Sequence, residues 1–202
     1  VSSPPLAAAT KVGPPRGSVI VVGGGGQGPE IFAKFIELAG GPEALILDVP
    51  TAGGDTVYPP TWRGQNGLKA AGAKNVLVLH TSKRSVADAD SFVVPIKRAG
   101  GIWFEGGRHF HLVDSYLGTK TEREFNAVLA RGGVAAGSSA GASILGSFLV
   151  RGAPSSNNAI MAYPGYLKGF AYPDERMMKD IAASAKKAKV ELHVPPKGEQ
   201  NA

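Results

Sequence analysis

The sequence contains no cysteine, and this absence removes several classes of protein at once. A disulfide-stapled scaffold, a thiolate metal site and a cysteine nucleophile all require that side chain. No apolar run approaches the roughly 18–20 residues that a membrane-spanning helix needs, so we expect no membrane span. Histidine is scarce, with four residues in 202, and few side chains are therefore available as a general base near neutral pH.

The net charge of +6 is unevenly distributed along the chain. Five lysines lie within residues 179–202: Lys179, Lys186, Lys187, Lys189 and Lys197. Few aromatic residues lie among them, and lysines along a helix are typical of a solvated face. We therefore expect no nucleic-acid partner.

Residues 1–17 are rich in Pro, Ser and Ala without any hydrophobic period, which predicts a disordered leader or linker. Residues 18–202 are expected to form a single α/β domain, since a chain of this length can bury one core. The chain begins with Val rather than Met, so we expect that an upstream segment was removed. A cleaved signal peptide is one such segment, which favours a secreted or periplasmic location over the cytoplasm. A homodimer is left open as the assembly.

Short apolar runs alternate with helical patterns along the chain. Strands are predicted at 18–22, 44–50, 75–80, 101–104 and 134–136, and helices at 29–39, 67–71, within 87–98, at 110–117 and after a capping box at 121–124. Pro95 is expected to start or break its helix. This alternation is typical of an α/β fold with a mostly parallel sheet and helices on both faces. In such sheets ligands bind at the carboxyl ends of the strands.

Residues 137–141 read Gly-Ser-Ser-Ala-Gly and join a buried strand to an apolar helical pattern at 142–150. Gly-x-Ser-x-Gly in this context is typical of a nucleophile elbow, with Ser139 as the nucleophile. The amide of Ala140 is a natural donor to an oxyanion, and the Gly106–Gly107 loop is the candidate for the second donor. The alternative is a close-packed turn without chemistry, because small residues are common in such turns.

Four segments carry a more specific signal than the elbow alone. They read Gly-Ile-Trp-Phe-Glu-Gly-Gly-Arg-His at 101–109, Leu-Val-Asp-Ser-Tyr-Leu-Gly-Thr at 112–119, Gly-Ser-Ser-Ala-Gly-Ala-Ser at 137–143 and Val-Arg-Gly at 150–152. Together they resemble the cyanophycinase-like serine peptidases, relatives of the bacterial aspartyl dipeptidases, over residues 18–170. The resemblance implies a three-layer sandwich related to class I glutamine amidotransferases, with Ser139 as nucleophile and an oxyanion hole built from the amides of Gly107 and Ala140.

The chain departs from that family downstream of the serine. Family members carry their catalytic histidine in an Asp-Gln-His stretch after a Gly-Phe pair, whereas residues 171–180 here contain no histidine. The loop at 155–158, which matches the position of the family's acid, reads Ser-Ser-Asn-Asn. His193 is the only histidine after Ser139 and is therefore the candidate base. The family's last strands are missing or divergent in this chain.

Arg108 and His109 follow the glycine pair and are expected to line the substrate pocket. A guanidinium pairs with carboxylates through two hydrogen bonds, which favours acidic substrates, and the alternative for Arg108 is a surface ion pair. His109 and His111 have no obvious third ligand, so we expect no metal site.

Residues 23–28 also satisfy Gly-x-Gly-x-x-Gly, and Asp48 follows about 20 residues later. That spacing is the dinucleotide-binding fingerprint, so an NAD-binding α/β protein is one alternative function. A catalytically inactive family member that serves as a binding protein is another. The leading interpretation is a cofactor-free serine peptidase, with exopeptidase character, that cleaves small or isopeptide-like peptides through Ser139.

Overall fold

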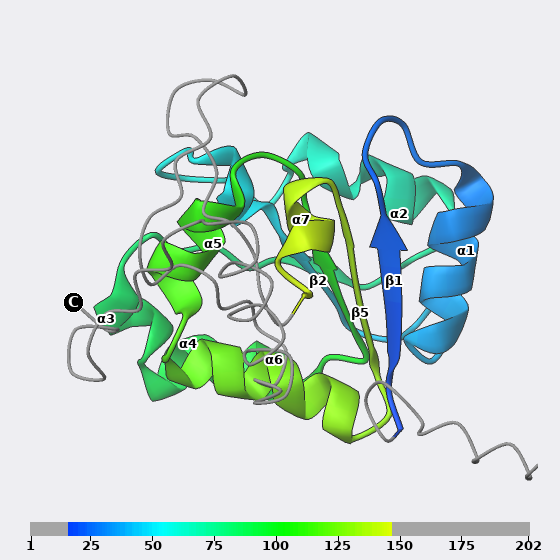
Figure 1. The fold of residues 1–202 in the computed structure, drawn as a ribbon. Helices are drawn as coiled ribbons and strands as arrows, with labels where there is room; N and C mark the ends of the chain where they lie inside the picture. The colour runs from blue at the N-terminus through cyan, green and yellow to red at the C-terminus, as the bar shows by residue number, and fades with distance from the viewer. Residues whose placement is uncertain (1–15, 147–202) are drawn as a thin grey trace, which may run out of the picture.

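The computed structural model describes residues 16–146, which form a five-stranded sheet covered by helices (Figure 1). The strands are β1 Ser18–Val22, β2 Ile46–Val49, β3 Val76–Val78, β4 Gly101–Phe104 and β5 Val134–Ser138. Their order is β1-β5-β4-β2-β3, and every neighbouring pair is parallel. The predicted α/β class and mostly parallel sheet are confirmed. Most of the expected leader, the 155–158 loop and His193 lie outside the described residues.

Different helices cover the two faces of the sheet. On one face lie α1 Pro29–Leu38 and α2 Asn66–Ala70, and on the other lie α4 Asp90–Arg98, α5 His109–Tyr116 and α6 Lys120–Ala130 (Figure 1). Successive residues of β4 alternate between them: Trp103 packs under α1 and α2, while Ile102 and Phe104 pack under the other layer. The central strands β2, β4 and β5 are buried on both faces, which is why they contain so few polar residues. The arrangement is a three-layer sandwich.

Short helical elements complete the described chain: η1 Pro50–Gly53, η2 Arg63–Gln65, α3 Arg84–Ala87 and α7 Ala140–Ser143. The single helix expected within 87–98 is replaced by α3 and α4, and Pro95 lies inside α4 rather than at its start or at a break. Because proline has no N–H, the carbonyl of Ser91 lacks its helical hydrogen bond. Ser91 lies in the exposed first turn of the helix, where water can donate to this carbonyl instead. None of the helices in residues 16–146 combines the length and apolar character that a membrane crossing requires.

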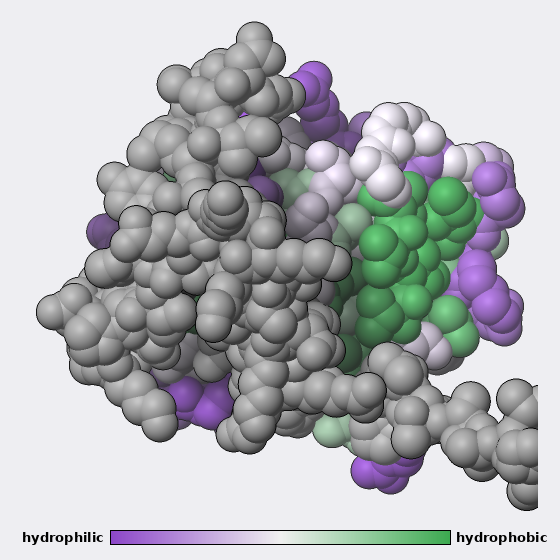
Figure 2. Space-filling view, in the orientation of Figure 1, coloured by the Kyte–Doolittle hydropathy of each residue, from purple (hydrophilic) through white to green (hydrophobic). Residues whose placement is uncertain are grey.

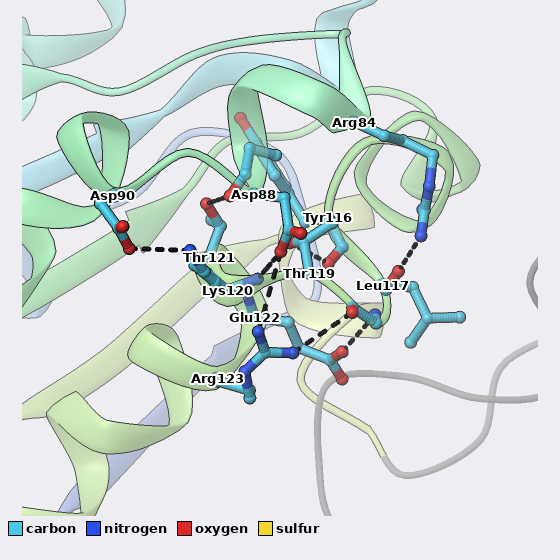
Figure 3. A network of polar contacts seen from close by, with 12 residues as sticks. Arg84, Asp88, Asp90, Tyr116, Leu117, Thr119, Lys120, Thr121, Glu122 and Arg123 are labelled. Atoms are coloured by element: carbon cyan, nitrogen blue, oxygen red, sulfur yellow. Dashed lines mark hydrogen bonds and ion pairs between the residues drawn. The ribbon is translucent and has the colours of Figure 1, made fainter.

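The predicted capping box at 121–124 is wrong by two residues. Thr119 is the N-cap of α6, and its Oγ1 accepts from the amide of Glu122 at 3.5 Å (Figure 3). The Glu122 carboxylate accepts from the amide of Gly118 at 2.6 Å. Thr121 is fully buried and donates to a carbonyl of α3 at 2.6 Å. The second threonine therefore ties two helices together instead of capping one.

Strand β1 forms one edge of the described sheet and pairs with β5 on its other side. Its side chains Val19 and Val21 are 41% and 66% exposed. Figure 2 shows a hydrophobic patch over this strand. The edge lies next to the strand that ends in the serine motif, so the loop after β1 reaches the same end of the sheet as Ser139.

Candidate active site

Ser139 lies at the sharp turn between β5 and α7. Its backbone angles are φ 54° and ψ −115°, and no other residue except glycine has a positive φ within residues 16–146. Such a conformation is strained and persists only where neighbouring contacts fix it. Here the Ser139 amide donates to the carbonyl of Val22 at 2.9 Å, and its carbonyl accepts from the amides of Ala142 and Ser143, each at 3.0 Å. The turn thereby presents an exposed serine at the carboxyl end of β5.

The two serines of the motif differ in their surroundings. Ser138 is 5% exposed, and its Oγ accepts a hydrogen bond from Gln27 Nε2 at 2.8 Å. Ser139 is exposed and follows the strand end. A substrate can therefore approach Ser139 but not Ser138, and the role of Ser139 as nucleophile stays a prediction.

The glycines on either side of the serines are required by close backbone contacts. A Cβ placed on Gly137 would lie 2.3 Å from the carbonyl oxygen of Gly141. A Cβ on Gly141 would lie 2.0 Å from the carbonyl oxygen of Phe104. Both distances are far below van der Waals contact with rigid backbone atoms, so no side chain fits. The close packing between β5, α7 and β4 therefore explains why the motif has glycine at both of these positions.

The loop after β4 brings the second glycine pair beside Ser139. A Cβ on Gly106 would lie 3.5 Å from Ser139 Cβ, so this residue faces the serine. Gly107 has φ 142° and packs against the carbonyl of Ala52, where a Cβ would come within 2.2 Å. Ala140 is the first residue of α7, where amides have no acceptor within the helix. The predicted oxyanion donors, Gly107 and Ala140, thus flank Ser139 on two elements, and their role stays a prediction.

The glycine-rich turn after β1 forms the other side of the site. Gly24, with φ 128°, lies close enough that a Cβ on it would be 3.6 Å from Ser139 Cβ and 4.0 Å from its Oγ. Two glycine-containing segments therefore face Ser139: this turn, through Gly24, and the loop after β4, through Gly106.

The strand order removes the geometric basis of the dinucleotide fingerprint. In that motif the acidic residue ends the strand next to the one that carries the glycine turn. Here β4 and β5 lie between β1 and β2, which carries Asp48. Asp48 is also fully buried, so it cannot reach a ribose bound at the turn after β1. The glycine turn instead packs beside the serine of another strand.

Arg108 and His109 lie where the loop after β4 enters α5. The Arg108 amide donates to the carbonyl of Ala52 at 2.7 Å, and both residues are half-buried. Their predicted contact with substrate stays a prediction. His111, one turn on, lies against Gly54, on which a Cβ would be 2.8 Å from His111 Nε2. No group of three or more His, Asp or Glu residues suited to a metal ion occurs within residues 16–146.

His80 belongs to a buried hydrogen-bond chain that supports η1. The amide of Thr81 donates to the hydroxyl of Tyr116 at 3.1 Å. The Tyr116 hydroxyl lies 2.7 Å from the hydroxyl of Thr51. The Thr51 hydroxyl in turn lies 2.9 Å from His80 Nδ1. If each hydroxyl donates once, Nδ1 is the acceptor and the ring is neutral. Burial also lowers the pKa of His80, which favours the neutral form. This histidine therefore orients the loop beside Gly107.

Sequence reasoning missed Glu105 and assigned Asp48 a different role, as the acid of a dinucleotide site. Glu105 immediately precedes the glycine pair, and Asp48 interrupts the apolar run of β2. Burial raises the pKa of Glu105 above its usual value. The Glu105 carboxyl also lies beside η2, since a Cβ on Gly64 would be 3.1 Å from its Oε1. An acid between a buried strand and two glycines was the available signal in the sequence.

Comparisons with known proteins agree with this geometry. The sequence model of peptidase family S51 matches residues 19–169. A cyanophycinase of Geminocystis herdmanii is 27% identical over 150 residues, which cover 71% of this chain and 54% of the relative. The chain thus spans about half the length of the curated relative it matches.

Solved structures give the same picture. A peptidase from an acI-B1 actinobacterium is 26% identical, with a TM-score of 0.61 over 88% of this chain and 76% of that one. A putative peptidase E from Listeria monocytogenes shares the fold at 16% identity, with a TM-score of 0.51 over 83% of this chain and 87% of that one. The family match covers most of the chain and includes the elbow with both glycine loops. The chain belongs to peptidase family S51.

Proposed function

We propose that this chain is a serine peptidase that cleaves small peptides or isopeptide-like bonds through Ser139. The observation that carries the proposal is the strained, exposed Ser139 between two backbone loops whose glycines leave room for a substrate carbonyl. The relative described as a cyanophycinase and the solved actinobacterial peptidase support the same class of reaction.

In the proposed reaction Ser139 Oγ attacks the carbonyl carbon of the scissile bond, and its proton passes to a base. The carbonyl oxygen becomes an oxyanion, which accepts hydrogen bonds from the amides of Gly107 and Ala140. The amine leaves with the proton from the base, and water then hydrolyses the acyl-enzyme. We assign the base to His193, because it is the only histidine that follows Ser139 in the sequence.

The proposed substrates carry a carboxylate beside the scissile bond. Arg108 supports this choice, because it lies directly after the glycine pair and a guanidinium pairs well with carboxylates. Exopeptidase action on short peptides fits a site whose walls are backbone loops close to the serine.

A second candidate function is a binding protein without turnover. The observation that favours it lies in the sequence: the family match ends at residue 169, and residues 140–169 contain no histidine. Without a base to accept the proton of the serine hydroxyl, the rate of hydrolysis falls by several orders of magnitude. In this case the site around Ser139 would bind peptides and release them unchanged.

Hydrolysis of acidic dipeptide p-nitroanilides by the full chain separates the two functions. For a peptidase, Ser139→Ala abolishes turnover, and His193→Ala lowers it about a thousandfold or more. Turnover that survives Ser139→Ala contradicts the proposal. Absence of turnover together with saturable binding of the same peptides supports the binding protein instead.

A further inference from the structure

The glycine turn of residues 23–26 is tied to the serine elbow at both of its ends. At its start, the carbonyl of Val22 accepts from the amide of Ser139 at 2.9 Å. At its end, Gln27 Nε2 donates to Ser138 Oγ at 2.8 Å and also to the carbonyl of Gly25. The turn is therefore held across the strand pair β1–β5 by one backbone bond and one side chain.

The orientation of the Gln27 amide follows from its neighbours. The carbonyl of Gly25 is an acceptor only, so the group facing it must be the NH2 rather than the oxygen. One hydrogen of that NH2 points to Gly25 and the other to Ser138 Oγ. Both donors of Gln27 are thus used to join the turn to the residue before the proposed nucleophile.

We propose that Gln27 is a positioning residue that latches the glycine turn beside Ser139, and that Gly24 in this turn contacts the main chain of the bound peptide. The inference rests on the proposed function, in which Ser139 attacks the scissile carbonyl. The turn has no side chains between residues 23 and 26, so what it presents to a ligand is backbone. Main-chain groups of a peptide are the matching chemistry.

The distances around Gly24 support this use. A Cβ on Gly24 would lie 4.0 Å from Ser139 Oγ, so Gly24 is in van der Waals range of the proposed nucleophile. A Cβ on Gly26 would meet no atom within 4 Å, and Gly26 has no positive φ. The two glycines of the same turn therefore differ: one faces the serine, and the other faces open space.

Boronic acids that form an adduct with Ser139 test the latch in the full chain. A dipeptide boronic acid reaches both the serine and the turn, whereas phenylboronic acid reaches the serine without a peptide main chain. We expect Gln27→Glu, which keeps the shape but removes both donors, to weaken the dipeptide boronate about tenfold or more and to leave phenylboronate affinity unchanged. Gly24→Ala should do the same, and Gly26→Ala is the matched control that binds both ligands like the wild type.

A coupled measurement checks the partner of the latch. Ser138→Ala removes the acceptor of Gln27 and should weaken the dipeptide boronate as Gln27→Glu does. The double variant should then be no weaker than either single variant, because one interaction is lost in all three. Thermal unfolding of each variant verifies that it is folded.

The outcomes separate the latch from the proposed function. Equal loss of both boronates in Gln27→Glu, or loss of neither, overturns the positioning role. If the wild type and Ser139→Ala bind dipeptide boronate equally, the proposed function fails. In that event hydrogen exchange still decides whether the latch exists. The amides of residues 24–26 should exchange faster in Gln27→Glu than in the wild type, and equal exchange overturns the latch itself.

Discussion

Asp48 on β2 and Glu105 directly after β4 form a buried carboxyl pair beside the serine site. The parallel register sets Asp48 opposite Trp103, and the Glu105 amide donates to the carbonyl of Val49 at 3.1 Å. Burial, and then the charge of Glu105, raise the pKa of Asp48 to about 8. Asp48 therefore keeps its proton at neutral pH, because two adjacent buried carboxylates cannot both ionise cheaply.

This pair predicts how stability depends on pH. The pKa of Asp48 is higher in the folded protein than its ordinary value of 3.8, so the folded state binds more protons than the unfolded state between about pH 4 and pH 8. Stability should therefore fall as pH rises through that window. Asp48→Asn keeps the size of the side chain but cannot ionise. We therefore expect its stability relative to the wild type to be higher at pH 8 than at pH 5 by roughly 1–3 kcal/mol.

Urea unfolding of both proteins at pH 5, 6.5 and 8 measures the effect. Asp90 offers a matched control, since it is an exposed acid paired with Lys120, and Asp90→Asn should leave the slope of the wild type almost unchanged. Parallel pH profiles for the wild type and Asp48→Asn would show that Asp48 is not the titrating group.

The strained turn at Ser139 predicts that this residue lowers stability. Glycine adopts a positive φ without steric cost, so Ser139→Gly should relieve the strain, while Ser139→Ala should retain it. After the entropy cost of a new glycine in the unfolded chain, we expect Ser139→Gly to be more stable than Ser139→Ala by about 0.5–2 kcal/mol. Equilibrium unfolding in urea gives the difference. A Ser139→Ala protein that is the more stable of the two argues against stored strain at the elbow.

Much of the layout was predictable because it depends on local patterns. The apolar run at 18–22 was correctly predicted to be a strand, although β1 is an edge strand whose Val19 and Val21 are exposed rather than buried on both sides. The turn at Ser139 was predictable because its glycines stand in the motif itself, although Gly141 is required by the carbonyl of Phe104 on the neighbouring strand. Such features can be predicted because the residues that indicate them lie within the element itself.

Other features depend on which strands become neighbours, and the sequence does not state this. The glycine turn and Asp48 have the spacing of a dinucleotide site, but two strands separate them in the sheet. Asp48 meets Glu105, 57 positions along the chain, only because β2 pairs with β4. The cap of α6 was misplaced for a similar reason: Thr121 finds a buried acceptor on α3, which leaves Thr119 as the cap.

Arg108 predicts the selectivity of the proposed peptidase. Its guanidinium would pair with a substrate carboxylate, so Arg108→Ala should weaken an acidic dipeptide by about ten- to a hundredfold and a neutral one by less than threefold. Arg123, an exposed arginine on α6, is a suitable control, and Arg123→Ala should change neither. Equilibrium binding of the two peptides to the full chain provides the comparison. Equal losses for both peptides in Arg108→Ala would mean that the residue acts only by supporting the fold.

The hydroxyl of Tyr116 links the core to the loop behind the oxyanion glycines. It accepts from the amide of Thr81 at 3.1 Å and lies 2.7 Å from the hydroxyl of Thr51 on η1, while the next residue, Ala52, holds the Arg108 amide through its carbonyl. Burial raises the pKa of Tyr116 to about 12, so the hydroxyl keeps its proton throughout the neutral range.

Tyr116→Phe should therefore leave the buried Thr81 amide without its acceptor and destabilise the protein by about 1–3 kcal/mol. Thr51→Val leaves the amide of Thr81 bonded but removes the partner of both the Tyr116 hydroxyl and His80 Nδ1, so its cost should be similar. Both variants should speed hydrogen exchange at the Arg108 amide, because η1 loses a side-chain anchor. Urea unfolding and amide exchange measure the two effects separately. If Tyr116→Phe unfolds like the wild type while Thr51→Val does not, the chain of hydroxyls draws its stability from the histidine end rather than from the tyrosine.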